Sequence, residues 1–315
     1  MEVFEGYKNL NQKLPNPVVT LGNFDGVHLG HQEIFSRVRE RAKEIQGTSL
    51  VYTFHPHPLS VLKQGREFLN ITTLEEKLNL IEKAGIDVVI CEPFTLEFSR
   101  LTAEEFVKNI LWGHIGTKEI FVGEDYTFGS KRQGNIHFLR TMGKSLNFRV
   151  KIIESQVKDN IIVKSSKIRE FIRQGDISTA NRLLGRHFSL SGKVIKGKGR
   201  GANLGFPTAN IKPDKILHPG TGVYAVWVTF RNQRFPGAMN IGYNPTFKDR
   251  ELSLEVYILD FNESIYGEKL DITFVARIRK EETFRSPQEL INQMHQDVIE
   301  ARKILGSNLG GLTTA

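Results

Sequence analysis

The stretch Gly22-Asn23-Phe24-Asp25-Gly26-Val27-His28-Leu29-Gly30-His31 decides the fold of the first half of the chain. It follows directly on residues 18–21, a run of β-branched and apolar side chains that is typical of a buried strand. It directly precedes residues 31–45, where apolar side chains recur at helical spacing and charged ones occupy the opposite face. Strand, glycine-rich turn and helix in this order predict a helix N-terminus that faces an anion.

Two histidines, His28 and His31, lie three residues apart at the start of this predicted helix. Imidazoles at such a place can bind the oxygens of a polyphosphate and stabilise charge that develops during group transfer. Glycines at 22, 26 and 30 let a ligand approach the backbone. A glycine-rich loop with two surface histidines is the simpler interpretation, but the flanking strand and helix favour the anion site.

The composition is that of a folded protein with one large domain or two ordinary ones, since 39% of its 315 residues are hydrophobic. A single cysteine, Cys91, excludes an internal disulfide and a cysteine-rich zinc site and fits a reducing compartment. The sequence has no basic-then-apolar leader, and its apolar runs are shorter than the about 20 residues that a membrane helix needs. We therefore expect a cytoplasmic protein that uses no membrane. The net charge of +8 suits nucleic acid and nucleotides equally.

The first half of the chain alternates strand-like and helix-like segments, which predicts an α/β domain built on a parallel sheet with helices on both faces. Capping boxes that begin at Thr73 and Thr102 open two of the helices. In such a sheet ligands bind beyond the carboxyl ends of the strands, where the glycine-rich turn lies. Further predicted strands are 50–54, 86–90, 118–122 and 150–153, and two short helices follow at 166–174 and 178–184.

The second half reads differently, because its strand-like runs follow one another without intervening helices. This pattern predicts an antiparallel barrel or sandwich, and Ser286-Pro287-Gln288-Glu289 then caps a closing helix. The runs are 188–195, 222–230, 237–241, 251–259 and 269–278, and the expected packing stripe of the helix is Leu290, Met294, Val298, Ala301 and Leu305. We place the domain boundary near 185–187, which gives domains at 1–185 and 186–306 and a loose tail at 307–315.

A second candidate site lies in this half. Gly197, Gly199 and Gly201 alternate with cations, which permits close approach to an anion, although a flexible basic loop is the simpler interpretation. Shortly after it, Thr208 and Asn210 offer oxygen ligands that point the same way on an extended segment, and Mg²⁺ bridging phosphates is the predicted occupant. A carboxylate on the polar face of the strand at 251–259 can serve as a general base. The pattern alone does not choose between Glu251 and Glu255 or exclude a merely solvated edge.

Several motifs resemble those of one family. Residues 22–31 resemble the HxGH signature of nucleotidylyltransferases in the form found in prokaryotic bifunctional riboflavin kinase/FAD synthetases. Residues 54–58 (FHPHP) resemble that family's PHP segment, and residues 123–129 (GEDYTFG) its G-x-D-F-x-F-G segment. Residues 205–210 (GFPTAN) are similar to the flavokinase motif, and residues 240–246 (NIGYNPT) to the N-I-G-x-x-P-T stretch. With this many motifs in order, the chain is identified as a member of the family.

The resemblance implies a nucleotidylyltransferase-like domain followed by a flavokinase-like barrel with a C-terminal helix. It implies two reactions that use ATP as co-substrate with Mg²⁺: phosphorylation of riboflavin to FMN in the second domain and adenylylation of FMN to FAD in the first. No tightly bound prosthetic group is required. The expected partners are riboflavin, FMN, FAD and ATP, without nucleic acid; the oligomeric state stays open, with a weak homo-oligomer as one alternative.

Residue roles carry over by position. The resemblance assigns catalysis to Glu255, His28 and His31, which resolves the choice between the two glutamates, and magnesium binding to Thr208 and Asn210. It assigns nucleotide binding to Gly22, Asn23, Asp25, Gly30, Asp125, Ser165, Ser166, Arg169, Gly197, Gly199 and Gly201, and flavin binding to Phe128, Arg279 and Phe284.

Two positions depart from the family pattern. Lys164 stands where the first serine of S-S-T-x-I-R is usual, which predicts a changed contribution to nucleotide binding, and Tyr126 replaces a phenylalanine. Three alternative functions would explain part of the same pattern. A class I aminoacyl-tRNA synthetase would share the HxGH site, a non-enzymatic module would bind nucleotide or flavin without turnover, and a zinc site would use His28, His31, His55 and His57.

Overall fold

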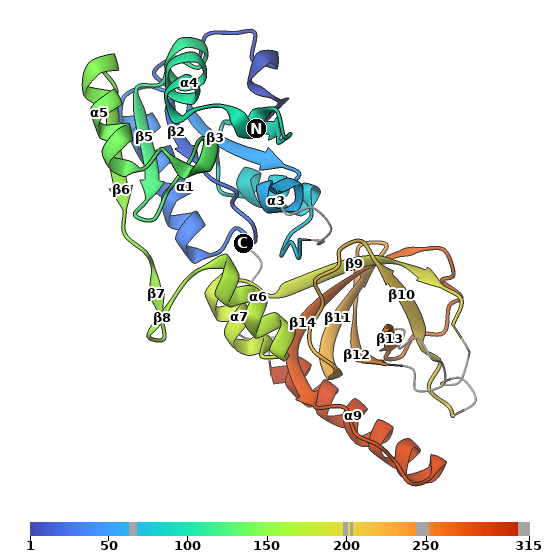
Figure 1. Ribbon diagram of the computed structural model, residues 1–315. Helices are drawn as coiled ribbons and strands as arrows, with labels where there is room; N and C mark the ends of the chain where they lie inside the picture. The colour runs from blue at the N-terminus through green and yellow to red at the C-terminus, as the bar shows by residue number, and fades with distance from the viewer. Residues whose placement is uncertain (63–67, 198–200, 202–203, 244–251, 308–315) are drawn as a thin grey trace. The chain divides into compact units, whose positions relative to one another are not determined.

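The computed structural model describes residues 1–62, 68–197, 201, 204–243 and 252–307 (Figure 1). Gly199, Glu251, residues 244–246 of the N-I-G motif and residues 308–315 of the predicted tail lie outside this range. The chain divides into two compact units, Met1–Ser165 and Ser166–Ala315. The functional boundary near residue 185 stays a prediction.

The first unit contains a sheet of six parallel strands in the order β1-β4-β3-β2-β5-β6. Because β2 pairs with β3 on one side and β5 on the other, the direction of strand succession changes at β2, and ligands bind at the carboxyl ends beside such a switch. The strands are β1 (Glu2–Glu5), β2 (Val18–Leu21), β3 (Ser49–His55), β4 (Val88–Pro93), β5 (Glu119–Gly123) and β6 (Arg149–Ile153).

Helices cover both faces of this sheet, as predicted. Alternate residues of β2 enter different cores: Val18 packs with Phe35 of α1, and Val19 packs with Ile110 of η3. Both capping boxes are confirmed, with the Thr73 and Thr102 side chains accepting from the N3 backbone amides. The longer helices are α1 (Leu29–Glu44), α3 (Leu74–Lys83), the π-helix η3 (Phe106–His114) and α5 (Ile136–Leu146). Short elements are η1 (Tyr7–Asn9), α2 (Pro58–Leu62), η2 (Phe98–Arg100), α4 (Ala103–Glu105), η4 (Ser130–Arg132), β7 (Val157–Lys158) and β8 (Ile161–Ile162).

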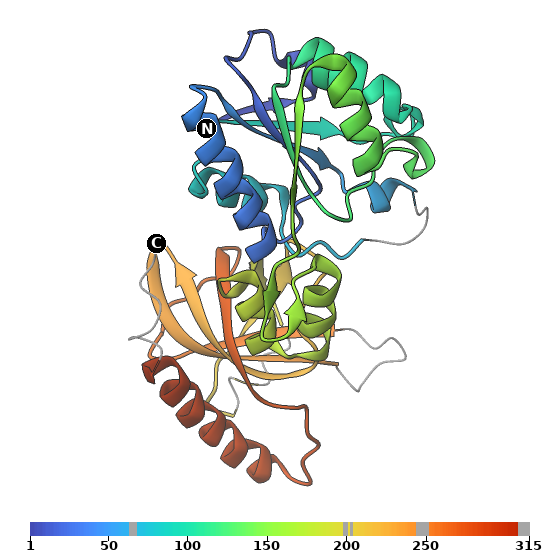
Figure 2. The same ribbon diagram turned by 90° about the vertical axis from the view of Figure 1, so that its left-hand side faces the viewer.

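The second unit is built on a closed antiparallel barrel in the order β10-β13-β12-β11-β14-β9, which decides between the predicted barrel and sandwich. Its strands are β9 (Phe188–Ile195), β10 (Ala209–Pro213), β11 (Gly222–Phe230), β12 (Gln233–Tyr243), β13 (Leu252–Ile258) and β14 (Lys269–Arg279). Closure removes the exposed edges that an open sheet would leave. The closing helix α9 (Pro287–Ser307) packs on β11, β12 and β14 and lies along the barrel wall in both views (Figures 1 and 2).

Two short helices, α6 (Ser165–Gln174) and α7 (Ile177–Leu184), pack with the barrel. The Asn181 side chain on α7 donates 2.9 Å to the carbonyl of Phe274 and accepts 2.7 Å from the amide of Phe188. One side chain thus satisfies a backbone group on each of two barrel strands. Among the described residues, no helix is both long and apolar enough to cross a bilayer.

Candidate active sites

The glycine-rich turn after β2 has an unusual backbone. Phe24 (φ 48°) and Val27 (φ 39°) lie in the left-handed region that side chains rarely adopt. Gly26 (φ 84°) lies there too, and a Cβ at this position would be 2.9 Å from Cδ1 of Ile71. Such strain persists only where the surroundings hold it.

Hydrogen bonds support the turn from one side through Asp25. Its buried carboxylate accepts from the amides of Ile71 at 2.9 Å and Thr72 at 3.2 Å, and its carbonyl accepts from the hydroxyl of Ser165 at 2.9 Å. Both Asp25 and Ser165 therefore support the turn through the chain itself; the nucleotide contacts assigned to them stay predictions.

A buried lysine supports the other side of the turn. Nζ of Lys77 on α3 donates to Oγ1 of Thr53 at 3.1 Å, to the carbonyl of Phe54 at 3.0 Å and to the carbonyl of Asn23 at 3.4 Å. Thr53 Oγ1 in turn donates to the same Asn23 carbonyl at 3.2 Å. Burial lowers the pKa of Lys77 below that of an ordinary lysine.

The two histidines come together at the start of α1. His28 is the N-cap residue and is buried, and its ring stacks on that of His31 with centroids 3.5 Å apart. Gly30 lies against the His28 ring, since a Cβ at position 30 would be 3.3 Å from atoms of that ring. His57 instead stacks on Phe68 at 3.8 Å. Across the described ranges, no three His, Cys, Asp or Glu side chains are grouped as a metal site needs.

A cavity of about 930 Å³ opens at the carboxyl ends of the strands of this unit. Gly22, Asn23, Asp125 and Phe128, all predicted site residues, line it. Its aromatic wall is formed by Phe54, Phe94 and Phe98, with ring centroids 5.6–5.9 Å apart, and it also has the cations Arg100, Lys131 and Arg132. Neither the wall nor the cations were predicted from the sequence. The positions of Phe94 and Phe98 in the sequence could have revealed the aromatic wall, because both residues come just after β4 at the ligand-binding edge of the sheet. The cavity offers aromatic surface for a planar ring and positive charge for an anion.

Lys164, the position that departs from the family pattern, forms an ion pair with Asp125 at 2.9 Å. This hydrogen bond raises the pKa of Lys164. Both side chains are exposed, and Asp125 lines the cavity, so the substitution brings a cation to its rim. Ser166 and Arg169 lie in the first turns of α6, within the second unit.

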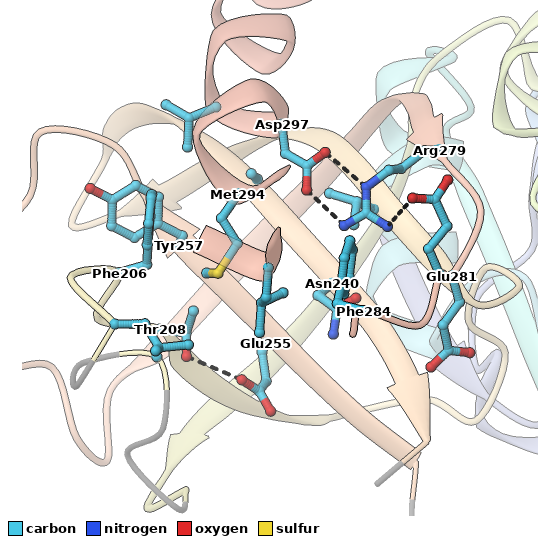
Figure 3. Close-up of a pocket in the computed structure, with 17 residues that line it drawn as sticks. Phe206, Thr208, Asn240, Glu255, Tyr257, Arg279, Glu281, Phe284, Met294 and Asp297 are labelled. Atoms are coloured by element: carbon cyan, nitrogen blue, oxygen red, sulfur yellow. Dashed lines mark hydrogen bonds and ion pairs between the residues drawn. The ribbon is translucent and has the colours of Figure 1, made fainter. Parts of the chain in front are cut away.

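In the second unit, Glu255 lies at the centre of a polar cluster (Figure 3). Its carboxylate accepts from Oγ1 of Thr208 at 3.2 Å and from Oγ of Ser253 at 2.7 Å. In the barrel register it is paired with Asn210 on β10 and Asn240 on β12, so an amide stands on each neighbouring strand. The sequence analysis did not assign Ser253, although it lies on the same strand face as Glu255.

Glu255 lines a cavity of about 290 Å³ beneath α9 (Figure 3). Thr208, Arg279 and Phe284 line it as well, and the Arg279 guanidinium lies 5.5 Å from the Phe284 ring. The first part of the helix stripe, at Leu290, Met294 and Val298, lines this cavity, whereas Ala301 and Leu305 are buried against the barrel. The predicted stripe is therefore an apolar face, but only its last two residues pack into the core.

The structure also contains an ion pair that the sequence analysis did not predict. Asp297, 3% exposed, accepts from Nε and Nη2 of Arg279 at 2.9 Å each. An acidic residue inside an apolar helix stripe was the available signal for a buried partner.

Close packing explains two of the glycines before the barrel site. A Cβ at Gly197 would collide with the Asn210 amide, and one at Gly201 would lie 3.1 Å from Oγ1 of Thr208. A smaller cavity of about 240 Å³, lined by Thr208, Ala209, Phe261 and Tyr266 among others, lies beside the first. Thr208 therefore borders both cavities.

Comparison with known proteins finds a matching family for each unit. The FAD synthetase family model matches residues 10–167, and the riboflavin kinase family model matches residues 184–305. A bifunctional riboflavin kinase/FMN adenylyltransferase of Buchnera aphidicola subsp. Schizaphis graminum is 38% identical over 307 residues, which cover 96% of this chain and 98% of that protein. The protein of the same name from Escherichia coli K12 is 33% identical over 308 residues, 97% and 98% of the two chains. A solved Streptococcus pneumoniae structure, named a macrolide-efflux protein, is 31% identical with a TM-score of 0.86 and covers 95% of this chain and 98% of its own.

Proposed function

The chain belongs to the family of bifunctional riboflavin kinases/FMN adenylyltransferases, and we propose that it phosphorylates riboflavin at Glu255 and adenylylates FMN at the His28 turn. Family membership rejects the aminoacyl-tRNA synthetase and the non-enzymatic module as alternatives. The observation that carries the residue assignment is the contact between Thr208 and Glu255 at the wall shared by two cavities.

The kinase step needs a base for a neutral hydroxyl. Riboflavin occupies the cavity under α9, with its ring between the apolar helix face and Phe284 and its terminal hydroxyl at Glu255. The hydroxyl proton passes to the Glu255 carboxylate as the oxygen attacks the γ-phosphorus of ATP, and ADP leaves. ATP occupies the neighbouring cavity, because Thr208 is where the two cavities meet.

The same cluster fits Mg²⁺, which binds hydroxyl, amide and carboxylate oxygens. The Thr208 hydroxyl and the Asn210 amide would hold the ion, with the Glu255 carboxylate 3.2 Å from the hydroxyl. When bound, Mg²⁺ neutralises charge on the transferred phosphoryl group. The close packing of Gly197 and Gly201 against these two residues supports the fixed position that metal ligands need.

The adenylyl step needs no strong base, because the FMN phosphate is already a nucleophile. One of its oxygens attacks the α-phosphorus of ATP; a P–O bond forms there as the bond to the pyrophosphate leaving group breaks. His28, His31 and the amino end of α1 stabilise the charge on the phosphates. The aromatic wall at Phe54, Phe94 and Phe98 takes the flavin ring.

The test is incubation of the full chain with riboflavin, Mg²⁺ and ATP, with FMN and FAD separated chromatographically over time. We expect His28→Ala to stop at FMN. We expect Glu255→Gln to lose FMN formation by a factor of about 10² or more but to convert supplied FMN to FAD.

Matched controls are His137→Ala on the exposed face of α5 and Glu268→Gln in a surface ion pair with Arg231. Both should retain both steps. If His28→Ala and Glu255→Gln each abolished both steps equally, the assignment of two sites would be wrong.

A further inference from the structure

The Lys77 ammonium carries a charge that its own contacts do not balance. The side chain is 7% exposed, and its three hydrogen-bond partners are the Thr53 hydroxyl and two backbone carbonyls. Among the described residues, no carboxylate forms an ion pair with it. An isolated buried charge costs stability, so a protein that keeps one gains something else from it.

The ammonium lies directly behind the wall of the 930 Å³ cavity. Its two carbonyl partners belong to Asn23 and Phe54, and both of these residues line the cavity. The backbone of Asn23 and Phe54 therefore lies between the positive charge and the cavity, and Asn23 belongs to the same turn as His28. A buried charge such as this one is screened less by water and acts more strongly at this range than a surface charge does.

We propose that Lys77 is a positioning residue for adenylyl transfer: it holds the strained turn through Asn23 and supplies a fixed positive charge whose counter-ion is the bound polyphosphate. This inference rests on the proposed nucleotide site of the first unit. Burial lowers the pKa of Lys77 and the charge of the Asp25 carboxylate acts in the opposite direction, but this carboxylate accepts from the amides of Ile71 and Thr72, so a direct counter-charge is left to the ligand.

Two variants of the full chain test the charge of Lys77 separately from its hydrogen bonds. Lys77→Met keeps the apolar stem and removes the charge. Thr53→Val breaks the same hydrogen-bond network, at both Lys77 and Asn23, and keeps the charge. Lys83→Met, an exposed position on the same helix, is the matched control.

We expect Lys77→Met to weaken binding of inorganic pyrophosphate, measured by calorimetry, and to raise the KM for ATP in FAD formation about tenfold, equivalent to 1.4 kcal/mol. Its thermal midpoint should stay close to that of the wild type, because three lost hydrogen bonds destabilise the folded chain while removal of the buried charge stabilises it. Thr53→Val should lower the midpoint with a smaller effect on pyrophosphate, and Lys83→Met should change neither. FMN formation by the second unit should be unchanged in all three.

Unchanged pyrophosphate affinity in a folded Lys77→Met chain would overturn the proposal. The proposal would also be overturned if the first unit were unfolded in both Lys77→Met and Lys77→Gln, since the role of the lysine would then be structural. Pyrophosphate binding also separates this proposal from the function on which it rests. A wild-type chain that binds pyrophosphate but makes no FAD refutes the proposed reaction and still tests Lys77.

Discussion

Asp297 on α9 accepts both forked hydrogen bonds of the Arg279 guanidinium at the end of β14, each at 2.9 Å. The pair joins the helix that roofs the kinase cavity to the barrel that forms its floor. Because Asp297 is buried and Arg279 is half-buried, the pair is part of the wall rather than a surface contact.

Asp297→Asn should raise the KM for riboflavin about tenfold, because Arg279 would lose its bidentate partner and keep only Glu282 at 3.8 Å, and α9 would be held less firmly. Removing one partner of a fully buried pair costs about 3–5 kcal/mol, and this half-buried pair should cost less, so the second unit should lose some thermal stability. The control is Asp260→Asn, which breaks the exposed pair between Asp260 and Arg302 on the same helix and should change the KM little. A normal riboflavin KM in Asp297→Asn would contradict the role given to the pair.

Gly26→Ala should abolish most FAD formation and destabilise the first unit by about 1–3 kcal/mol, since φ is 84° and the new methyl group would meet Ile71. Thermal unfolding and FMN-to-FAD conversion measure the two effects. Gly116→Ala is the control, because Gly116 has a φ of 72° but nothing within 4 Å of a Cβ. It should lose stability through strain alone and keep its activity.

Lys164→Ser, which restores the family residue, should raise the KM for ATP two- to threefold at low salt, because a cation leaves the rim of the cavity. The difference should shrink in 0.5 M salt, as interactions of exposed charges are screened over about 10 Å or less. Thermal stability should stay nearly constant, since the pair with Asp125 is a surface one. A salt-independent change would point away from electrostatics.

The second unit should lose stability in mild acid through His187. Burial, and then the charge of Arg234, lower the pKa of His187 below its usual 6.5. As the pH falls from about 7 through 6.5 toward that lowered pKa, the unfolded chain takes up a proton before the folded one does, and folding becomes less favourable. Thermal midpoints between pH 7.5 and 5 should therefore fall less steeply in His187→Gln than in the wild type. Parallel curves would contradict this.

Local signals in the sequence predicted the frame of both units. The capping boxes at Thr73 and Thr102 and the turn at 22–31 are short-range patterns that need no tertiary information, and each is present. The helix α1 begins at Leu29, two residues before the predicted start, with His28 as its cap. Strand β1 was not predicted, because its residues Glu2–Glu5 are mostly exposed and lack an apolar alternation.

The features that could not be predicted from the sequence are those that depend on long-range contacts. Strand β10 is short and lies between loops, so only its pairing with β9 and β13 reveals it as the sixth strand of the barrel. Lys77 precedes the buried Ile81 by one helical turn, which places it on the buried face of α3, yet its three acceptors come from β3 and the turn. No pattern within the helix identifies those partners.

The position of Thr208 between two cavities has a kinetic consequence. On the proposed assignment the phosphoryl donor and the acceptor occupy separate cavities and do not obstruct each other, so either substrate can bind first and either product can leave first. Initial-rate measurements on the kinase step should therefore give intersecting double-reciprocal plots, and ADP and FMN should each act as a competitive inhibitor toward the substrate whose cavity it shares.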